Sequence, residues 1–149
     1  MILVLNTNTN FCKIYHYQKN HPAKLSLLKT IDHPENKLKN SEIGTDRPGH
    51  YHSSNTARGA FTPHANPKEV EIDNFSREIM NVLNKEREKQ SYQELIIIAP
   101  PHMDGMLFQH INKNVKNLVI NNIKKDIVHL TDAELLHYLQ TEAKYHDPS

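Results

Sequence analysis

A short apolar run, "LIIIA" at 95–99, restricts what this chain can fold into more than any other feature. Side chains alternate between the two faces of a strand, so a run that is apolar at every position needs cover on both faces. Pro100 and Pro101 end the run, because proline has no backbone N–H to give to a sheet. We therefore predict a strand over 95–99 inside a sheet with helices on both sides, which is an α/β architecture.

The first third of the chain predicts a small antiparallel meander. Residues 11–18 alternate apolar and polar side chains, as a half-buried strand does. The Asn/Thr-rich turn "NTNTN" joins them to the short apolar run 2–5, and His21-Pro22 precedes a third strand over 24–31. The carboxyl-terminal two thirds then add helices and parallel-type strands.

Capping residues locate the two clearest helices. Asn66 fits an N-cap before Pro67, and Glu69 completes a capping-box pattern; Thr131 and Glu134 repeat that pattern before the last helix. The first helix has an apolar stripe at helical spacing, which predicts a face packed on the core: Ile72, Phe75, Ile79, Val82 and Leu83. A short helix over 102–111 and a strand over 115–120 complete the order β-β-β, long segment, α-β-α-β-α. The chain is predicted to be a single domain, 1–149, with a mixed sheet in an α/β sandwich.

The segment 32–67 has almost no apolar periodicity, and connections longer than about 15 residues are usually functional or disordered. It holds three of the four glycines and half of the four arginines. Guanidinium groups suit bidentate phosphate contacts, and basic residues interleaved with an aromatic ring suit RNA. A solvated loop, with acids that offset the cations, is the other interpretation. The candidate RNA- or partner-binding residues are Lys37, Lys39, Asp46, Arg47, Pro48, Gly49, His50, Tyr51, His52 and Arg58.

Composition excludes several classes of function. The net charge is +1, which argues against a bulk electrostatic partner such as DNA or a membrane surface. No run approaches the roughly 20 apolar residues of a membrane-spanning helix, and the opening ten residues lack the basic region of a signal peptide. The single Cys12 allows no internal disulfide and fits a reducing compartment. A cytoplasmic location is expected.

The sequence offers little enzyme or metal chemistry. A two-metal nuclease needs several carboxylates at the strand ends, but strand one ends in Asn6 and Asn8, and only Asp104 and Asp126 are available. There is no G-x-S-x-G nucleophile motif and no Gly-rich phosphate loop. We expect no cofactor and no metal, although one set of side chains could chelate an ion or supply a general base for a hydrolase: Asp46, His50, His52 and His64.

Four segments resemble the bacterial host attachment protein family in sequence and order: "HPENKLKNSEIGTDRPGHYHSS", "NPKEVEIDNFSREI", "LIIIAPPHMDGML" and "IKKDIVHLTDAEL". That family is similar to the middle domain of archaeal and eukaryotic class-1 release factors and of Pelota. The resemblance implies a ribonuclease-H-like fold of the kind found in translational machinery components. It also implies a ribosome- or RNA-facing role, with the long segment toward the peptidyl-transferase region.

Three functions stay open at this point. The first is a non-catalytic, intracellular ribosome- or RNA-associated domain that affects translation and, indirectly, attachment to host cells. The second is a hydrolase of release-factor type acting on an ester or RNA, although the Gly-Gly-Gln tripeptide of release factors is absent. The third is a protein-interaction module acting in surface attachment. The sequence does not fix the oligomeric state.

Overall fold

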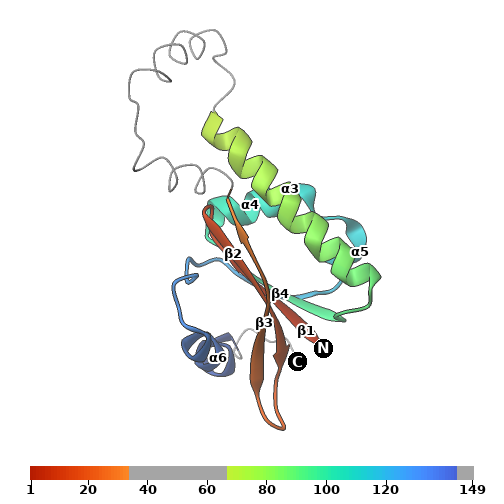
Figure 1. Ribbon diagram of the computed structural model, residues 1–149, viewed down its shortest axis with the longest axis vertical. Coiled ribbons are helices and arrows are strands. Elements are labelled where there is room, and N and C mark those ends of the chain that lie inside the picture. Colours follow the sequence, from red (N-terminus) through yellow and green to blue (C-terminus); the bar gives the residue numbers. More distant parts are fainter. Residues whose placement is uncertain (34–66, 144–149) are drawn as a thin grey trace, which may run out of the picture.

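The computed structural model describes residues 1–33 and 67–143, which form one sheet with helices on both faces (Figure 1). In chain order the elements are β1 (Ile2–Thr7), β2 (Phe11–Gln18), β3 (Lys24–Asp32), α3 (Pro67–Glu88), β4 (Glu94–Ile98), α4 (Pro101–His110), α5 (Lys113–Lys116), β5 (Val119–Ile123) and α6 (Asp132–Thr141). The predicted α/β class is confirmed.

The sheet has five strands in the order β3-β2-β1-β4-β5. Strands β3, β2 and β1 are antiparallel neighbours, whereas β1, β4 and β5 run parallel, so the sheet is mixed as predicted. The apolar run that begins at Leu95 lies in β4, between β1 and β5. Its odd-numbered residues face one apolar cluster and its even-numbered residues face the other, which explains why every position is apolar.

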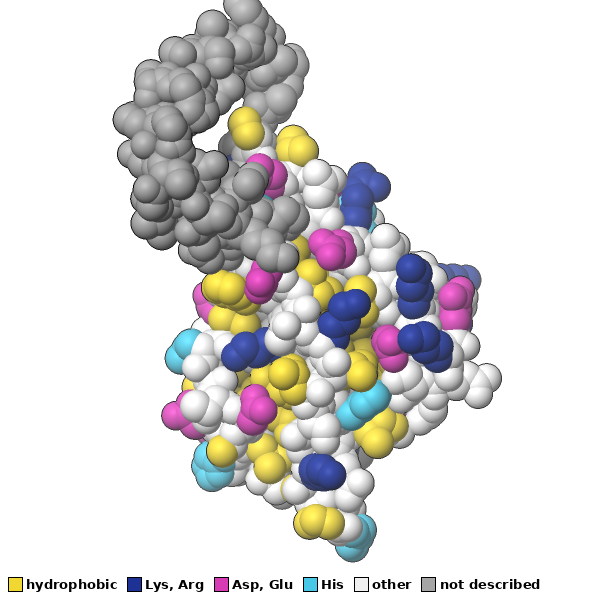
Figure 2. All heavy atoms as spheres, in the orientation of Figure 1, with side chains coloured by type: hydrophobic (Ala, Val, Ile, Leu, Met, Phe, Trp, Pro, Cys, Tyr) yellow, Lys and Arg dark blue, Asp and Glu magenta, His cyan; other side chains and the backbone are white. Residues whose placement is uncertain are grey.

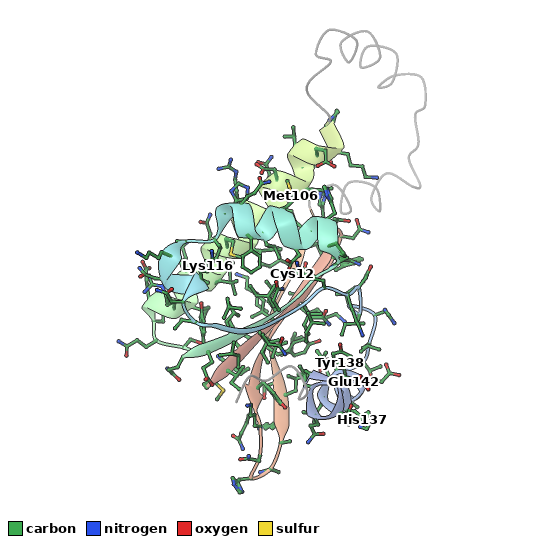
Figure 3. All side chains as sticks on the ribbon, turned by 180° about the vertical axis from the view of Figure 1, so that it is seen from behind. Cys12, Met106, Lys116, His137, Tyr138 and Glu142 are labelled. Atoms are coloured by element: carbon green, nitrogen blue, oxygen red, sulfur yellow. The ribbon has the colours of Figure 1, made fainter. Side chains whose placement is uncertain are left out.

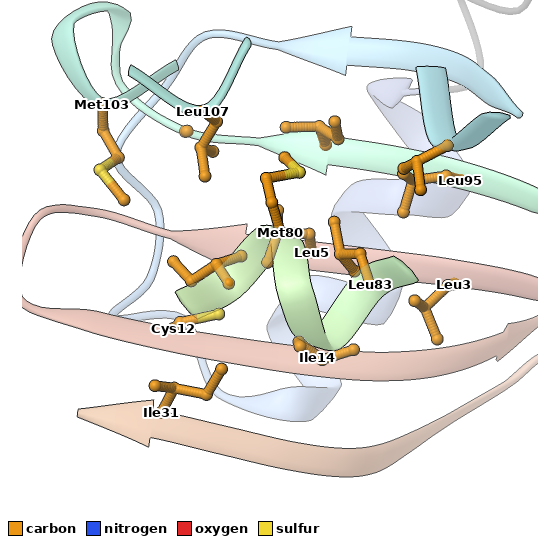
Figure 4. Close-up of a cluster of buried hydrophobic side chains, with 14 of the residues drawn as sticks. Leu3, Leu5, Cys12, Ile14, Ile31, Met80, Leu83, Leu95, Met103 and Leu107 are labelled. Atoms are coloured by element: carbon orange, nitrogen blue, oxygen red, sulfur yellow. The ribbon is translucent and has the colours of Figure 1, made fainter. Parts of the chain in front are cut away.

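The helices α3, α4 and α5 cover one face of the sheet. The predicted stripe of α3 faces the sheet: Ile72, Phe75, Ile79 and Leu83 are buried, and Val82 packs against the cluster from a partly buried position. Figure 4 shows this cluster, with Leu5, Cys12 and Ile31 on the strands and Met80 and Leu83 on the helix. Within the described residues, no helix is both long enough and apolar enough to cross a lipid bilayer.

The last helix, α6, covers the other face. Leu135 and Leu139 are buried against β-strand residues such as Val4 and Ile98, and Leu136 is partly buried. The predicted capping box is present: the Thr131 hydroxyl accepts a hydrogen bond from the Glu134 backbone N–H at 3.1 Å, and the Glu134 carboxylate accepts one from the Thr131 N–H at 2.8 Å. A hydrogen bond also joins β2 to this helix, because the hydroxyl of Tyr15 donates to the Asp132 carboxylate at 3.1 Å.

One predicted strand differs from the structure. The strand expected over 115–120 is divided: Val115 belongs to the short helix α5, and the strand β5 runs instead over Val119–Ile123. The cause is a helix cap, because the Asn112 side chain accepts a hydrogen bond from the Val115 N–H at 2.8 Å. Val115 therefore reaches the core from a helical turn, with 1% of its surface exposed.

Candidate functional site

Every predicted binding residue in the long segment, from Lys37 to Arg58, lies outside the described residues, and so does the His50 and His52 pair. The structure does describe the two points where that segment joins the fold. It leaves after His33, at the end of β3, and returns at Pro67, the first residue of α3. In Figure 1 both points lie at the same end of the molecule.

The departure point is fixed to the fold. The backbone N–H of His33 donates to the carbonyl of Asn10 at 3.1 Å, and the His33 ring packs against Phe75 of α3 with centroids 5.2 Å apart. His33 is buried, with 4% of its surface exposed. The segment therefore starts from a position set by both the sheet and α3.

The parallel strands β1, β4 and β5 end at this same edge of the sheet, which we call the carboxyl edge. Asp32 of β3 pairs with Phe11, and Thr7 at the end of β1 pairs with the adjacent Cys12. In α/β sheets, ligands usually bind outside the carboxyl ends of parallel strands. The segment 34–66 thus leaves the fold beside the place where this architecture usually binds ligands.

Asn8 organises the turn that follows β1. Its side-chain oxygen accepts hydrogen bonds from the backbone N–H groups of Asn10 at 2.8 Å and Phe11 at 2.9 Å. Its amide nitrogen lies 3.3 and 3.4 Å from the two carboxylate oxygens of Asp126, which follows β5. One side chain therefore shapes the turn and joins the ends of two strands that are far apart in sequence.

Asn6, which lies in β1 two residues before Asn8, is fully buried. Its amide nitrogen donates to the carbonyl of Ile127 at 3.3 Å, so it holds the connection between β5 and α6 against the sheet. Its side-chain oxygen is buried and has no hydrogen-bond partner among the described residues. An amide supplies no negative charge at the end of the first strand, where a two-metal site would need a carboxylate.

The buried Asp104 has a structural role. It lies in the first turn of α4, with 4% of its surface exposed, and accepts a hydrogen bond from the Asn122 side chain at 2.7 Å. The same Asn122 amide nitrogen lies 3.2 Å from the carbonyl of Ile97. Over residues 1–33 and 67–143, no group of three or more His, Cys, Asp or Glu side chains is arranged to hold a metal ion.

Two histidine–carboxylate contacts join α4 to the first turns of α3, beside the return point of the long segment. His102 lies 3.2 Å from Glu69, and His110 lies 2.6 Å from Asp73. Arg77, one turn along α3, pairs with Asp73 at 3.0 Å. Hydrogen bonds from His110 first, and then from Arg77, hold the pKa of Asp73 below its usual range.

The carboxyl edge also carries two consecutive lysines. Lys124 and Lys125 follow β5 directly and are exposed. The ammonium group of Lys125 lies 5.7 Å from the centre of the ring of Tyr138, a residue of α6 that is labelled in Figure 3. Elsewhere the face in Figure 2 shows basic and acidic side chains interspersed, without a single-sign patch.

These lysines and the contact between Asn8 and Asp126 are the residues that sequence reasoning missed. The sequence does contain a signal for them. The tripeptide "KKD" directly follows the last strand, and in a parallel sheet the residues after that strand lie on the same side as those that follow β1. At this edge the Asn8 amide nitrogen contacts the Asp126 carboxylate, and the exposed lysines Lys124 and Lys125 directly precede Asp126, so ammonium groups are what the edge offers to an anion. One histidine–carboxylate pair, His102 with Glu69, lies on the same side, at the starts of α4 and α3.

Comparison with known proteins identifies a family and a relative. A family model described as "Protein required for attachment to host cells" matches residues 1–139. The chain is also similar to an uncharacterised protein of Rickettsia prowazekii (strain Madrid E), with 32% identity over 117 residues. That similarity covers 76% of this chain and 73% of the relative.

Proposed function

This chain belongs to the family of proteins required for attachment to host cells, and we propose that it serves attachment indirectly, as a non-catalytic domain that binds RNA inside the cell. The expected source of that RNA is the ribosome. The observation that carries the proposal is the carboxyl edge, where the exposed lysines Lys124 and Lys125 lie on the side from which residues 34–66 leave the fold.

Lysine and asparagine side chains are common phosphate and sugar contacts in nucleic-acid complexes, and they position the bound strand without reading its sequence. Arg47, Arg58, Lys37 and Lys39 of the long segment would add further phosphate contacts. Tyr51, between His50 and His52, would supply a ring on which an unpaired base can stack.

The mixed sheet with antiparallel first strands is compatible with the ribonuclease-H-like fold of release-factor middle domains, which we propose for this chain. Shared fold alone does not carry function. The chemistry of the edge supports binding over cleavage, because Asp104 and Asp126 both accept hydrogen bonds from asparagines. We therefore propose a ribosome-associated role without catalysis.

The test is co-sedimentation of the full-length protein with purified ribosomes through sucrose gradients at low and high salt. Neutralised phosphates release counterions, so binding should fall steeply as salt rises. Arg47→Ala, and separately the pair Lys124→Ala with Lys125→Ala, should reduce the bound fraction at moderate salt. Each lost phosphate contact should also lower the salt slope by about 0.7–0.9.

A matched control removes two lysines elsewhere. Lys113→Ala with Lys116→Ala makes the same change in net charge on α5, at the other end of the sheet, and should leave co-sedimentation unchanged (Lys116 in Figure 3). Absence of co-sedimentation at every salt concentration would refute the proposal. Equal losses in the two lysine pairs would show that net charge, and not the carboxyl edge, governs the binding.

A further inference from the structure

A cavity of about 360 Å³ lies on the α6 face of the sheet, away from the carboxyl edge. Tyr17, one of its lining residues, pairs with Ile2 at the amino end of β1, so the cavity lies toward the opposite edge. Figure 1 marks this end by the N-terminus. The volume falls within the roughly 300–1,000 Å³ typical of small-molecule sites.

Tyr17 is the unusual residue of this cavity. Only 5% of its surface is exposed, and its side chain lines the cavity without a hydrogen bond to any other described residue. Buried tyrosine hydroxyls normally have one. The other buried tyrosines follow that rule: Tyr15 donates to Asp132, and Tyr92 donates to the carbonyl of Leu83 at 2.8 Å.

Burial raises the pKa of the Tyr17 hydroxyl, so at neutral pH the group is a protonated donor. A donor that lines a cavity and lacks an acceptor is a position where a ligand atom can supply the acceptor.

The rest of the lining indicates the class of ligand. Ile96, Ile120 and Leu139 supply apolar walls, and Lys19 is the one charged side chain among the described residues that line the cavity. None of these described lining residues is an Asp or a Glu. An apolar body would be buried against the walls, and an anionic group would be favoured beside the ammonium and the hydroxyl.

We propose that this cavity binds a small organic anion with an apolar, aromatic-sized body, whose carboxylate accepts a hydrogen bond from Tyr17 and lies beside Lys19. The site is separate from the carboxyl edge, so it does not depend on the RNA-binding role. Its ligand would be a metabolite-sized arylalkyl carboxylate.

The test is a titration of the full-length, ¹⁵N-labelled protein with phenylacetate and 4-phenylbutyrate, followed by amide chemical shifts. Saturable shifts are expected at Tyr17, Ile120 and Leu139. Phenylacetamide, the uncharged analogue, should bind at least several-fold more weakly. Absence of saturable shifts with both acids, or equal affinity for acid and amide, would overturn the proposal.

Variants locate the binding. Tyr17→Phe keeps the ring and should raise the Kd for phenylacetate about tenfold, the loss expected for one hydrogen bond to a charged acceptor. Tyr92→Phe removes a buried hydroxyl on the other face of the sheet and should leave the Kd unchanged. Thermal unfolding of both variants checks that they are folded.

Two further variants separate the parts of the site. Lys19→Gln should weaken the binding of phenylacetate and leave that of phenylacetamide unchanged. Ile120→Phe, at a partly exposed position of β5, should abolish binding of both by filling the cavity. Unchanged affinity in Ile120→Phe together with Tyr17→Phe would place the ligand elsewhere and overturn the assignment.

Discussion

The imidazole nitrogen Nε2 of His110 lies 2.6 Å from a carboxylate oxygen of Asp73, and this contact joins the last turn of α4 to the second turn of α3. Both helices approach the carboxyl edge, and α3 begins where the long segment returns to the fold. The pair therefore bears on the stability of the part of the molecule that supports the proposed binding surface.

The charge of Asp73 should make stability depend on pH. His110, and then Arg77, lower the pKa of this carboxyl below its ordinary 3.8. A lowered folded-state pKa contributes stability that is complete above the unfolded pKa and is lost as the pH falls through the folded pKa. Urea unfolding should show Asp73→Asn less stable than the wild type at pH 6–7. The difference should shrink below pH about 4.

His110→Ala should remove part of the same pH-dependent stability and leave the part due to Arg77. Free energies of unfolding that differ by a constant amount from pH 7 to pH 3 would contradict the assignment to the Asp73 charge.

The capping box of α6 should contribute about 1 kcal/mol to the free energy of unfolding. Thr131→Ala removes the hydroxyl that accepts from the Glu134 N–H, and loss of such caps costs about 0.5–2 kcal/mol. Thr131→Ser keeps the hydroxyl and should stay within about 0.5 kcal/mol of the wild type. Chemical denaturation followed by circular dichroism measures both, and equal losses in the two variants would exclude a capping effect.

Two residues of α3 test the orientation of that helix. Leu83 is fully buried and Val70 is 48% exposed. Leu83→Ala should lower the free energy of unfolding by about 2–5 kcal/mol, through lost burial and the cavity left behind. Val70→Ala should change it by no more than about 0.5 kcal/mol. Comparable losses at the two positions would mean that the helix presents another face to the sheet.

The single thiol should report unfolding. Cys12 has 1% of its surface exposed, and burial raises the pKa of its thiol well above the usual range. Because the thiolate is the reactive form, a disulfide reagent should modify Cys12 in the native protein roughly 10³–10⁶ times more slowly than in urea. Figure 3 shows Cys12 within the interior. Rapid stoichiometric labelling of the native protein would refute this burial.

Local patterns in the sequence predicted most of the elements. The alternation over 11–18 and the start at Pro67 match the structure, and Thr131 caps the last helix as predicted. These features depend on residues within a few positions of one another. The strand β5 was placed too early because Val115 is apolar whether it enters the core from a strand or from a helical turn capped by Asn112.

The candidate site was less predictable, because its contacts join distant segments. The amide of Asn8 meets Asp126 across 118 positions in sequence, and no local pattern records that pairing. Amides at the end of strand one were visible, and the structure adds that Asn6 is buried and bonded to Ile127. The binding residues proposed from Lys37 to Arg58 stay predictions, since they lie outside the described part of the chain.

The anchoring of His33 has an evolutionary consequence. His33 is held by Asn10 and Phe75, and Pro67 opens a helix packed on the core, so contacts within the described fold help to fix both junctions. Doubling the length of a connection costs only about 0.6 kcal/mol of closure entropy. Related proteins could therefore change the length and sequence of the segment between His33 and Pro67 while keeping the same sheet and helices. Binding specificity could then diverge under selection without changes in the core.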